Sequence, residues 1–125
     1  MKAFTDLPQS KKLAEFLPLE SADMHYATWA ILDGEFIVST NQGSTIEDLQ
    51  EDYGNQIIPC WSLAALLDIL PKTINFGNEY DSTFVLKPLE NDKYLADYYD
   101  VSFIKDNPVD ACVEMIIKLN ELNLL

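Results

Sequence analysis

The chain has 125 residues, the usual size of one domain, and 48% of them are hydrophobic, so it can bury a core and is not disordered as a whole. Its 21 acidic residues oppose 8 basic residues, all of them lysine, for a net charge of −13. An acidic chain without arginine lacks the side chain that best grips phosphate, so direct binding to nucleic acid is not expected.

Hydropathy and the cysteines predict a cytoplasmic protein. No apolar run reaches the roughly 18 residues of a membrane-spanning helix, and the first residues do not read as a signal peptide. Cys60 and Cys112 each stand among apolar neighbours, as small buried hydrophobes do. Two buried thiols are the favoured interpretation because cytoplasmic chains seldom keep a structural disulfide, although the spacing alone leaves a bridge open.

The first predicted elements are a helix over residues 8–17 and a β-hairpin. Residues 28–32 and 35–40 alternate as strands do, and they flank Asp33-Gly34. This dipeptide is a preferred two-residue turn because both of its positions require a positive φ. Apolar residues occur on both faces of the hairpin, so we expect both faces to be partly covered.

A short acidic helix is predicted over residues 46–53. Ser44 or Thr45 serves as its N-cap, and Glu47 stands three residues after Ser44, which fits a capping box. Gly54 closes the helix, since glycine readily adopts the backbone conformation that follows a last turn.

Two further helices are strongly apolar and are therefore predicted to be buried. The first covers residues 62–70, with Ser62 as its N-cap. The second begins after Asn107, which caps it, and Pro108 takes its first position. Its polar residues form only one narrow stripe, so most of its circumference must pack against protein.

Strands are predicted over residues 83–89, 94–99 and 101–104, and Pro88 indicates that the first of them lies at a sheet edge or ends early. Together with the helices, they indicate one α+β domain over residues 1–125. In this fold an antiparallel sheet packs against helices, including a largely buried C-terminal helix.

The single histidine, His25, is the only candidate base for nucleophilic catalysis. Such catalysis needs a base that is held by a third group, and the sequence does not show that arrangement. A zinc site built from His25, Cys60 and Cys112 lacks the closely spaced ligand pairs of structural zinc sites. We therefore expect no catalytic residue, no metal site and no cofactor.

The net negative charge is concentrated between Leu13 and Pro71, a stretch that holds acidic residues but no lysine. Within it, like charges recur at four-residue spacing on the acidic helix, and such pairs are destabilising unless something compensates them. The favoured interpretation is that solvent alone screens these charges. A basic protein surface that compensates them is the second interpretation, and a bound cation is the third. The four carboxylates concerned are Glu47, Asp48, Glu51 and Asp52.

Three segments carry a resemblance: QSKKLAEFLPLESADM at 9–24, IPCWSLAALL at 58–67 and NPVDACVEMIIKL at 107–119. The chain resembles a family of small prophage and mobile-element proteins of gut Bacteroidetes to which no activity is assigned. The resemblance implies a bacterial cytoplasm and a phage-related setting. The region 26–55 carries none of these motifs.

Burial explains most residues of the motif segments, but it does not explain Trp61 or Asp23. Trp61 precedes a helix, where it either fixes the helix entry or lines a groove. We therefore predict a binding site that includes Trp61, Met24, His25 and Asp23, with the four carboxylates of the acidic helix as a second candidate.

The favoured function is a non-enzymatic accessory protein of phage or mobile-element origin that acts through protein–protein interaction. Its acidic first half would suit a basic protein surface. One alternative is an acidic decoy that mimics DNA, which requires carboxylates spaced like phosphates on one face. The other is a small hydrolase that uses His25, and it is the least favoured.

Overall fold

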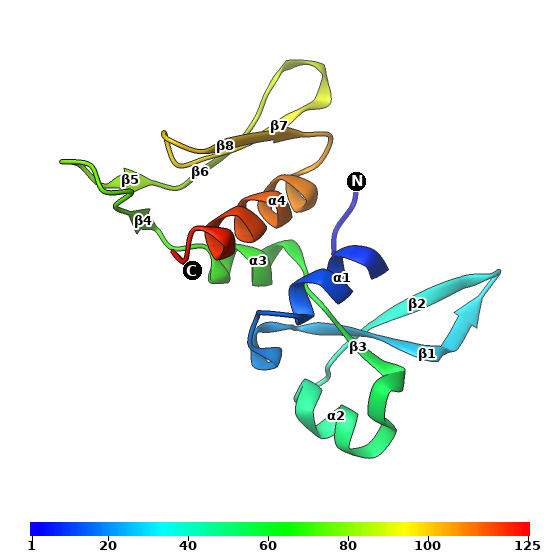
Figure 1. Ribbon diagram of the computed structural model, residues 1–125. Helices are drawn as coiled ribbons and strands as arrows, with labels where there is room; N and C mark the ends of the chain where they lie inside the picture. Colours follow the sequence, from blue (N-terminus) through cyan, green and yellow to red (C-terminus); the bar gives the residue numbers. More distant parts are fainter. The chain divides into compact units, whose positions relative to one another are not determined.

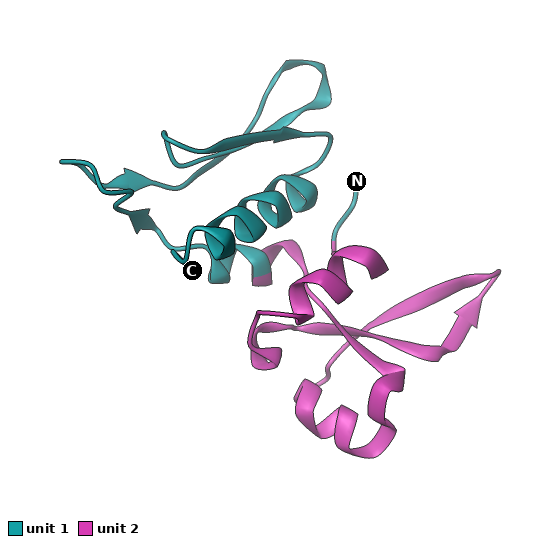
Figure 2. Cartoon of the chain, in the orientation of Figure 1, with its two compact units in different colours: residues 1–3, 66–125 teal, residues 4–65 magenta.

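The computed structural model describes residues 1–125 and shows an α+β protein with four α-helices and three small antiparallel sheets (Figure 1). The predicted fold class is confirmed. The chain divides into two compact units (Figure 2): unit 2 spans Phe4–Ala65, and unit 1 combines Met1–Ala3 with Leu66–Leu125. The single domain expected from the length stays a prediction. No helix is both long and apolar enough to cross a bilayer.

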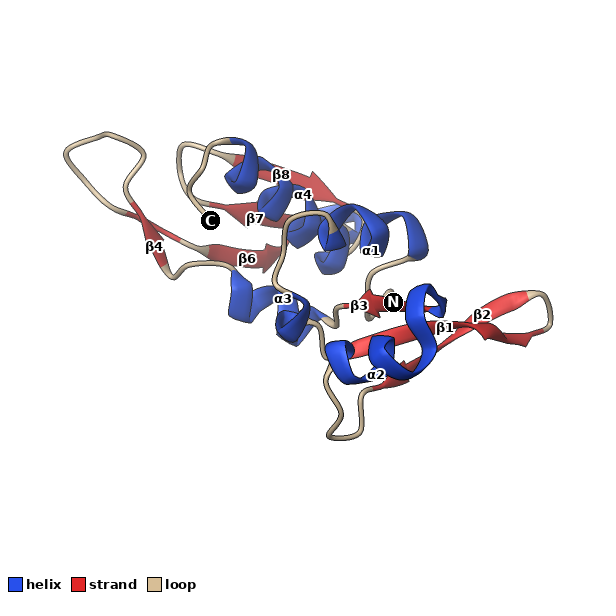
Figure 3. Ribbon diagram, turned by 60° about the horizontal axis from the view of Figure 1, so that its bottom comes forward, coloured by secondary structure: helices blue, strands red, loops and turns tan.

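Unit 2 is built on a three-stranded sheet with the strand order β2-β1-β3. Its strands are β1 (Met24–Leu32), β2 (Glu35–Thr40) and β3 (Ile57–Cys60). The predicted hairpin is confirmed, with Asp33 and Gly34 at φ values of 52° and 82°. Because β3 pairs only with the first residues of β1, the hairpin continues beyond it as a two-stranded ribbon (Figure 3).

The helices of unit 2 begin at side-chain caps. Helix α1 (Leu7–Ala14) has a capping box between Asp6 and Gln9. Helix α2 (Ile46–Tyr53) is capped by Thr45, whose hydroxyl accepts from the backbone N–H of Asp48 at 3.1 Å. The predicted capping box from Ser44 to Glu47 is therefore wrong, because the helix begins one residue later than that pairing requires.

Helix α3 (Leu63–Ile69) contributes its first three residues to unit 2 and the rest to unit 1. The hydroxyl of Ser62 caps it by accepting from the backbone N–H of Ala65 at 3.2 Å. Leu66 and Leu70 are buried, whereas Leu67 is 38% exposed, so this helix faces water more than its apolar sequence predicts.

Unit 1 contains two sheets and the C-terminal helix. Strands β4 (Thr73–Ile74) and β5 (Ser82–Thr83) form a pair. Strands β6 (Val85–Pro88), β7 (Tyr94–Asp97) and β8 (Ser102–Lys105) form the larger sheet in that order. Pro88 lies on the edge strand β6, as predicted, so the N–H that proline lacks is not needed for pairing with a neighbouring strand. Three short 3₁₀ helices complete the fold: η1 (Leu19–Ser21), η2 (Gly54–Gln56) and η3 (Glu90–Asp92).

Helix α4 (Pro108–Glu121) packs against β7 and β8. Asn107 caps it by accepting from the backbone N–H of Asp110 at 2.8 Å, and Pro108 takes the first position. Eight of its residues are buried, so the predicted burial of this helix is confirmed: Pro108, Val109, Ala111, Cys112, Val113, Met115, Ile116 and Leu119.

Ile116→Asp should abolish the cooperative unfolding of unit 1. Ile116 is fully buried in α4, and an unpaired carboxylate there costs about 5 kcal/mol, comparable to the whole stability of a small domain. Circular dichroism melts test this. The control is Leu122→Asp, because Leu122 is the C-cap of the same helix and is 41% exposed. A cooperative melt of Ile116→Asp within a few degrees of the wild type would show that α4 is not core.

Candidate functional site

Trp61, the first predicted binding residue, lies in the core of unit 2. Its side chain is 0% exposed, and its indole Nε1 donates to the hydroxyl of Ser21 at 2.9 Å. Its backbone is held by Thr5, which donates its N–H to the Trp61 carbonyl at 2.9 Å. The Trp61 N–H in turn donates to Oγ1 of Thr5 at 3.1 Å. Packing and hydrogen bonding therefore account for this tryptophan, and binding at Trp61 stays a prediction.

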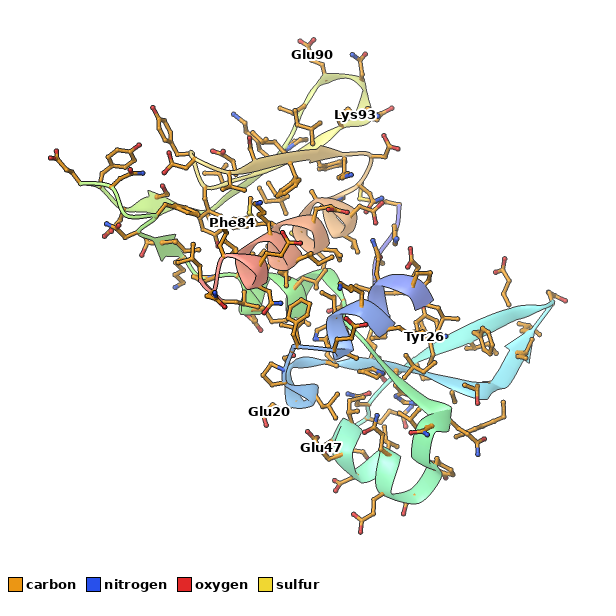
Figure 4. The ribbon with its side chains drawn as sticks, viewed as in Figure 1. Glu20, Tyr26, Glu47, Phe84, Glu90 and Lys93 are labelled. Carbon is orange, nitrogen blue, oxygen red and sulfur yellow. The ribbon has the colours of Figure 1, made fainter.

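Buried hydroxyl and thiol groups surround Thr5. Oγ1 of Thr5 and Oγ of Ser10 are 2.7 Å apart, and the phenol of Tyr26 donates to the Thr5 carbonyl at 2.8 Å. Tyr26, which Figure 4 labels, is the third residue of β1. The Cys60 thiol donates to the same carbonyl at 3.4 Å. Sequence reasoning did not single out Thr5 or Ser10, because isolated hydroxyl residues carry no pattern that predicts a shared buried cluster.

Asp23, another predicted binding residue, is occupied by helix capping. One oxygen of its carboxylate accepts from the backbone N–H of Ser62 at 2.9 Å, and the other accepts from the Ser62 hydroxyl. Ser62 then caps α3. The carboxylate therefore supports the start of a helix, where a negative charge is favourable.

His25 is not part of a nucleophilic dyad or triad. Its Nδ1 is 2.9 Å from Oδ1 of Asn41, and Nδ2 of Asn41 donates to the carbonyl of Ala22 at 2.9 Å. Met24 and His25 are successive residues of β1, so their side chains point to opposite faces of the sheet. With Trp61 fully buried, Met24, His25 and Trp61 do not line one concavity.

The four predicted carboxylates of α2 are all exposed and lie on one side of the helix: Glu47, Asp48, Glu51 and Asp52. Figure 4 marks Glu47 in the first turn of this helix. None of the four forms an ion pair with a lysine. We refer to these four residues as the acidic face. Tyr53, on the same helix, has its ring centroid 4.9 Å from that of Trp29 on β1, which holds α2 beside the hairpin.

The outer half of the hairpin exposes large apolar side chains, each of them only partly covered, in line with the partial cover that the sequence predicts. The exposed fractions range from 40% to 64% for Trp29, Ile31, Leu32, Phe36 and Ile37, which we call the hairpin surface. It has two faces, with Trp29, Ile31 and Phe36 on one and Leu32 and Ile37 on the other. Because β3 pairs only with Met24–Ala27 and β2 is an edge strand, no third strand lies beside this part of the hairpin. A register shift between Tyr26 and Ile31 adds local twist to the exposed part.

Unit 1 contains a shallow, largely open cavity of about 500 Å³ that sequence reasoning missed. Its lining comes from the two residues before β5, from β5, β6 and the end of β7, and from the turn that follows β7. The lining includes two tyrosines and two aspartates: Tyr80, Tyr99, Asp81 and Asp97. The pairing of Val85 with Asp97 across β6 and β7 brings these distant segments together.

No protein-family model, no curated protein and no solved structure matches the chain. No group of three or more histidine, cysteine, aspartate or glutamate side chains is arranged to hold a metal ion. The geometry leaves two candidate sites: the hairpin surface in unit 2, with the acidic face on α2, and the cavity in unit 1.

The cysteines should resist a thiol reagent in the folded protein. Both thiols are free and buried, and burial raises the pKa of Cys112 to about 12 and raises the pKa of Cys60 as well. Thiolate, the reactive form, is thus scarce at about pH 8. A chromogenic disulfide reagent should modify neither cysteine in buffer and both in denaturant. Rapid modification of either thiol in the native protein would contradict the assigned burial.

Thr5→Val should lower the free energy of unfolding by about 2 kcal/mol, since it leaves the buried N–H of Trp61 without its acceptor. Urea denaturation followed by tryptophan fluorescence measures the change. Thr40→Val, the same substitution at an exposed position of β2, is the control and should be nearly neutral. Equal effects of the two variants would mean that the Thr5 hydroxyl does not support the fold.

Proposed function

We propose that this chain is a non-enzymatic accessory protein that binds a basic partner protein through the hairpin surface, and that the acidic face of α2 attracts this partner at longer range. The observation that carries the proposal is the exposure of five large apolar side chains on the hairpin. The resemblance to prophage and mobile-element proteins supports a phage-related setting for this binding.

The apolar side chains supply the binding energy in this proposal. Exposed apolar patches that are rimmed by charged residues mark interaction surfaces more often than scattered apolar residues do. The hairpin surface is rimmed by Asp33 and Glu35 at its tip, whereas the acidic face of α2 lies on the side of that helix opposite Tyr53, the residue that contacts the hairpin. Covering its half-exposed side chains would contribute on the order of 5 kcal/mol before the entropic cost of association.

The free edge of β2 defines the geometry of the contact. In the order β2-β1-β3, the outer N–H and C=O groups of β2 have no strand beside them. An extended segment of a partner can add there as a further strand, with main-chain hydrogen bonds for affinity and alternate side chains for specificity. The occupant in this proposal is an extended partner segment of alternating apolar and basic residues.

The negative charge of the chain determines that the partner segment is basic rather than acidic. The acidic face has no lysine within ion-pair distance, and the chain as a whole carries a net charge of −13. Such a surface speeds the approach of a basic segment and repels an acidic one. Because exposed charges are screened by ions, raising the salt concentration should slow association and weaken binding.

A peptide of about eight residues that alternates lysine and valine, a common strand length, probes this surface. Titration into ¹⁵N-labelled protein should give saturable shifts confined to residues 35–40 and neighbours, with slower amide exchange along β2. The same peptide with glutamate in place of lysine should not bind. Shifts that are absent from residues 35–40 would overturn the proposal.

Ile37→Thr should weaken binding of the lysine–valine peptide about fivefold, because it removes an exposed apolar contact on the edge strand β2. Ile104→Thr is the matched control, since Ile104 is also exposed and also lies on an edge strand, β8 of unit 1. Equal affinity of the two variants in the peptide titration would rule out the hairpin surface as the contact.

A further inference from the structure

We propose that the cavity of unit 1 is a binding site for an alkylammonium group, that is, a primary amine on an aliphatic chain. This site is separate from the hairpin surface, because every residue that lines it belongs to unit 1. A volume of about 500 Å³ suits a small organic group.

Uncompensated negative charge gives the cavity its preference for a cation. Asp81 and Asp97 line it, and Asp100 lies beside it, where it accepts hydrogen bonds from Asn78 at 2.8 Å and Tyr80 at 3.5 Å. None of these three carboxylates forms an ion pair with a lysine. An anion would be repelled here, whereas an ammonium group offers three donors to carboxylate oxygens.

The aromatic walls suit the same ligand. The rings of Tyr80 and Tyr99 meet edge to face, with centroids 5.7 Å apart, and their side chains are 49% and 76% exposed. A cation over a tyrosine face is attracted by the ring quadrupole. Val85, 41% exposed on the cavity wall, offers an apolar contact for the methylene groups of the ligand.

A buried hydroxyl in the wall lacks a partner. Ser82 is 3% exposed and lines the cavity, and its Oγ is the buried side-chain oxygen for which no hydrogen bond is present. An unsatisfied buried hydroxyl is unfavourable, and because this oxygen is itself inaccessible to water, a ligand donor reaches it only if the Ser82 side chain rotates toward the cavity.

The backbone of Tyr99 holds its ring in the cavity wall through a conformation that is uncommon for tyrosine. Tyr99 has a φ of 66°, and it is the only aromatic residue in the left-handed region. The turn is held by the backbone N–H of Tyr99, which donates to Oδ1 of Asp97 at 3.0 Å, and by that of Tyr98, which donates to the Val101 carbonyl at 2.9 Å. Glycine or asparagine would fit this turn with less strain, yet an exposed tyrosine occupies it.

Titration of ¹⁵N-labelled protein with butylamine hydrochloride tests the site. Saturable shifts should appear at residues 80–85 and 97–99. The neutral analogue 1-butanol should produce none, and tetramethylammonium, which has charge but no N–H donor, should bind more weakly than butylamine. Equal responses to butylamine and 1-butanol, or shifts outside these residues, would overturn the assignment.

A free diamine and a lysine side chain of another protein share this chemistry, and two probes distinguish them. Tighter binding of 1,4-diaminobutane than of Nα-acetyl-lysine N-methylamide would identify a free amine as the source. The reverse order would identify a protein lysine. Both outcomes support an ammonium site, and failure of both probes to bind overturns it without affecting the peptide contact on β2.

Two variants separate a ligand role from a structural one. Tyr99→Asn keeps the left-handed turn but removes the ring, so it should weaken butylamine binding at least fivefold and leave the melting temperature equal or higher. Asp97→Asn keeps the oxygen that accepts from Tyr99 and removes only the charge, so it should weaken binding by a similar factor.

Asp92→Asn, at an exposed turn of unit 1 outside the cavity, is the control and should bind as the wild type does. Unchanged binding in Tyr99→Asn and Asp97→Asn, or a marked loss of stability in Tyr99→Asn, would contradict the proposal.

Discussion

Unit 2 depends on the reciprocal hydrogen bonds between Thr5 and Trp61. The N–H of Thr5 bonds the carbonyl of Trp61, and the N–H of Trp61 bonds the hydroxyl of Thr5. These bonds join the segment before α1 to the segment between β3 and α3. They also fix the backbone of Trp61, whose buried indole N–H donates to the hydroxyl of Ser21. Since both partners are 0% exposed, water cannot replace the bonds if one partner is removed.

The motif segments 9–24 and 58–67 are explained by contacts between them. Ser21 accepts from the Trp61 indole, and Asp23 accepts from Ser62, the residue that caps α3. Residues that suggested a binding groove in the sequence are therefore accounted for by structure in unit 2. Side-chain pairs of this kind cannot be read from spacing, because the two residues lie 39 or 40 positions apart.

Local signals predicted turns and helix caps well, but strand extents and tertiary cover were predicted poorly. Strand β3 was not predicted, β1 begins four residues earlier than predicted, and the strand expected over residues 83–89 is divided between β5 and β6. Asp33-Gly34, Asn107-Pro108 and Pro88 each impose a backbone constraint that acts within a few residues, and each prediction held. The exposed hairpin and the cavity depend on which strands pair and where pairing stops. The cavity exists because Val85 pairs with Asp97, and neither the alternation nor the composition of these strands specifies that register.

Amide hydrogen exchange in the native protein tests the central role of the Thr5–Trp61 pair most directly. The N–H groups of Thr5 and Trp61 should be among the slowest of unit 2 and should exchange only when the unit unfolds globally. Exchange of these two amides at rates close to those of the exposed turn at Asp33 and Gly34 would contradict the account, because the pair would then open without unfolding the unit.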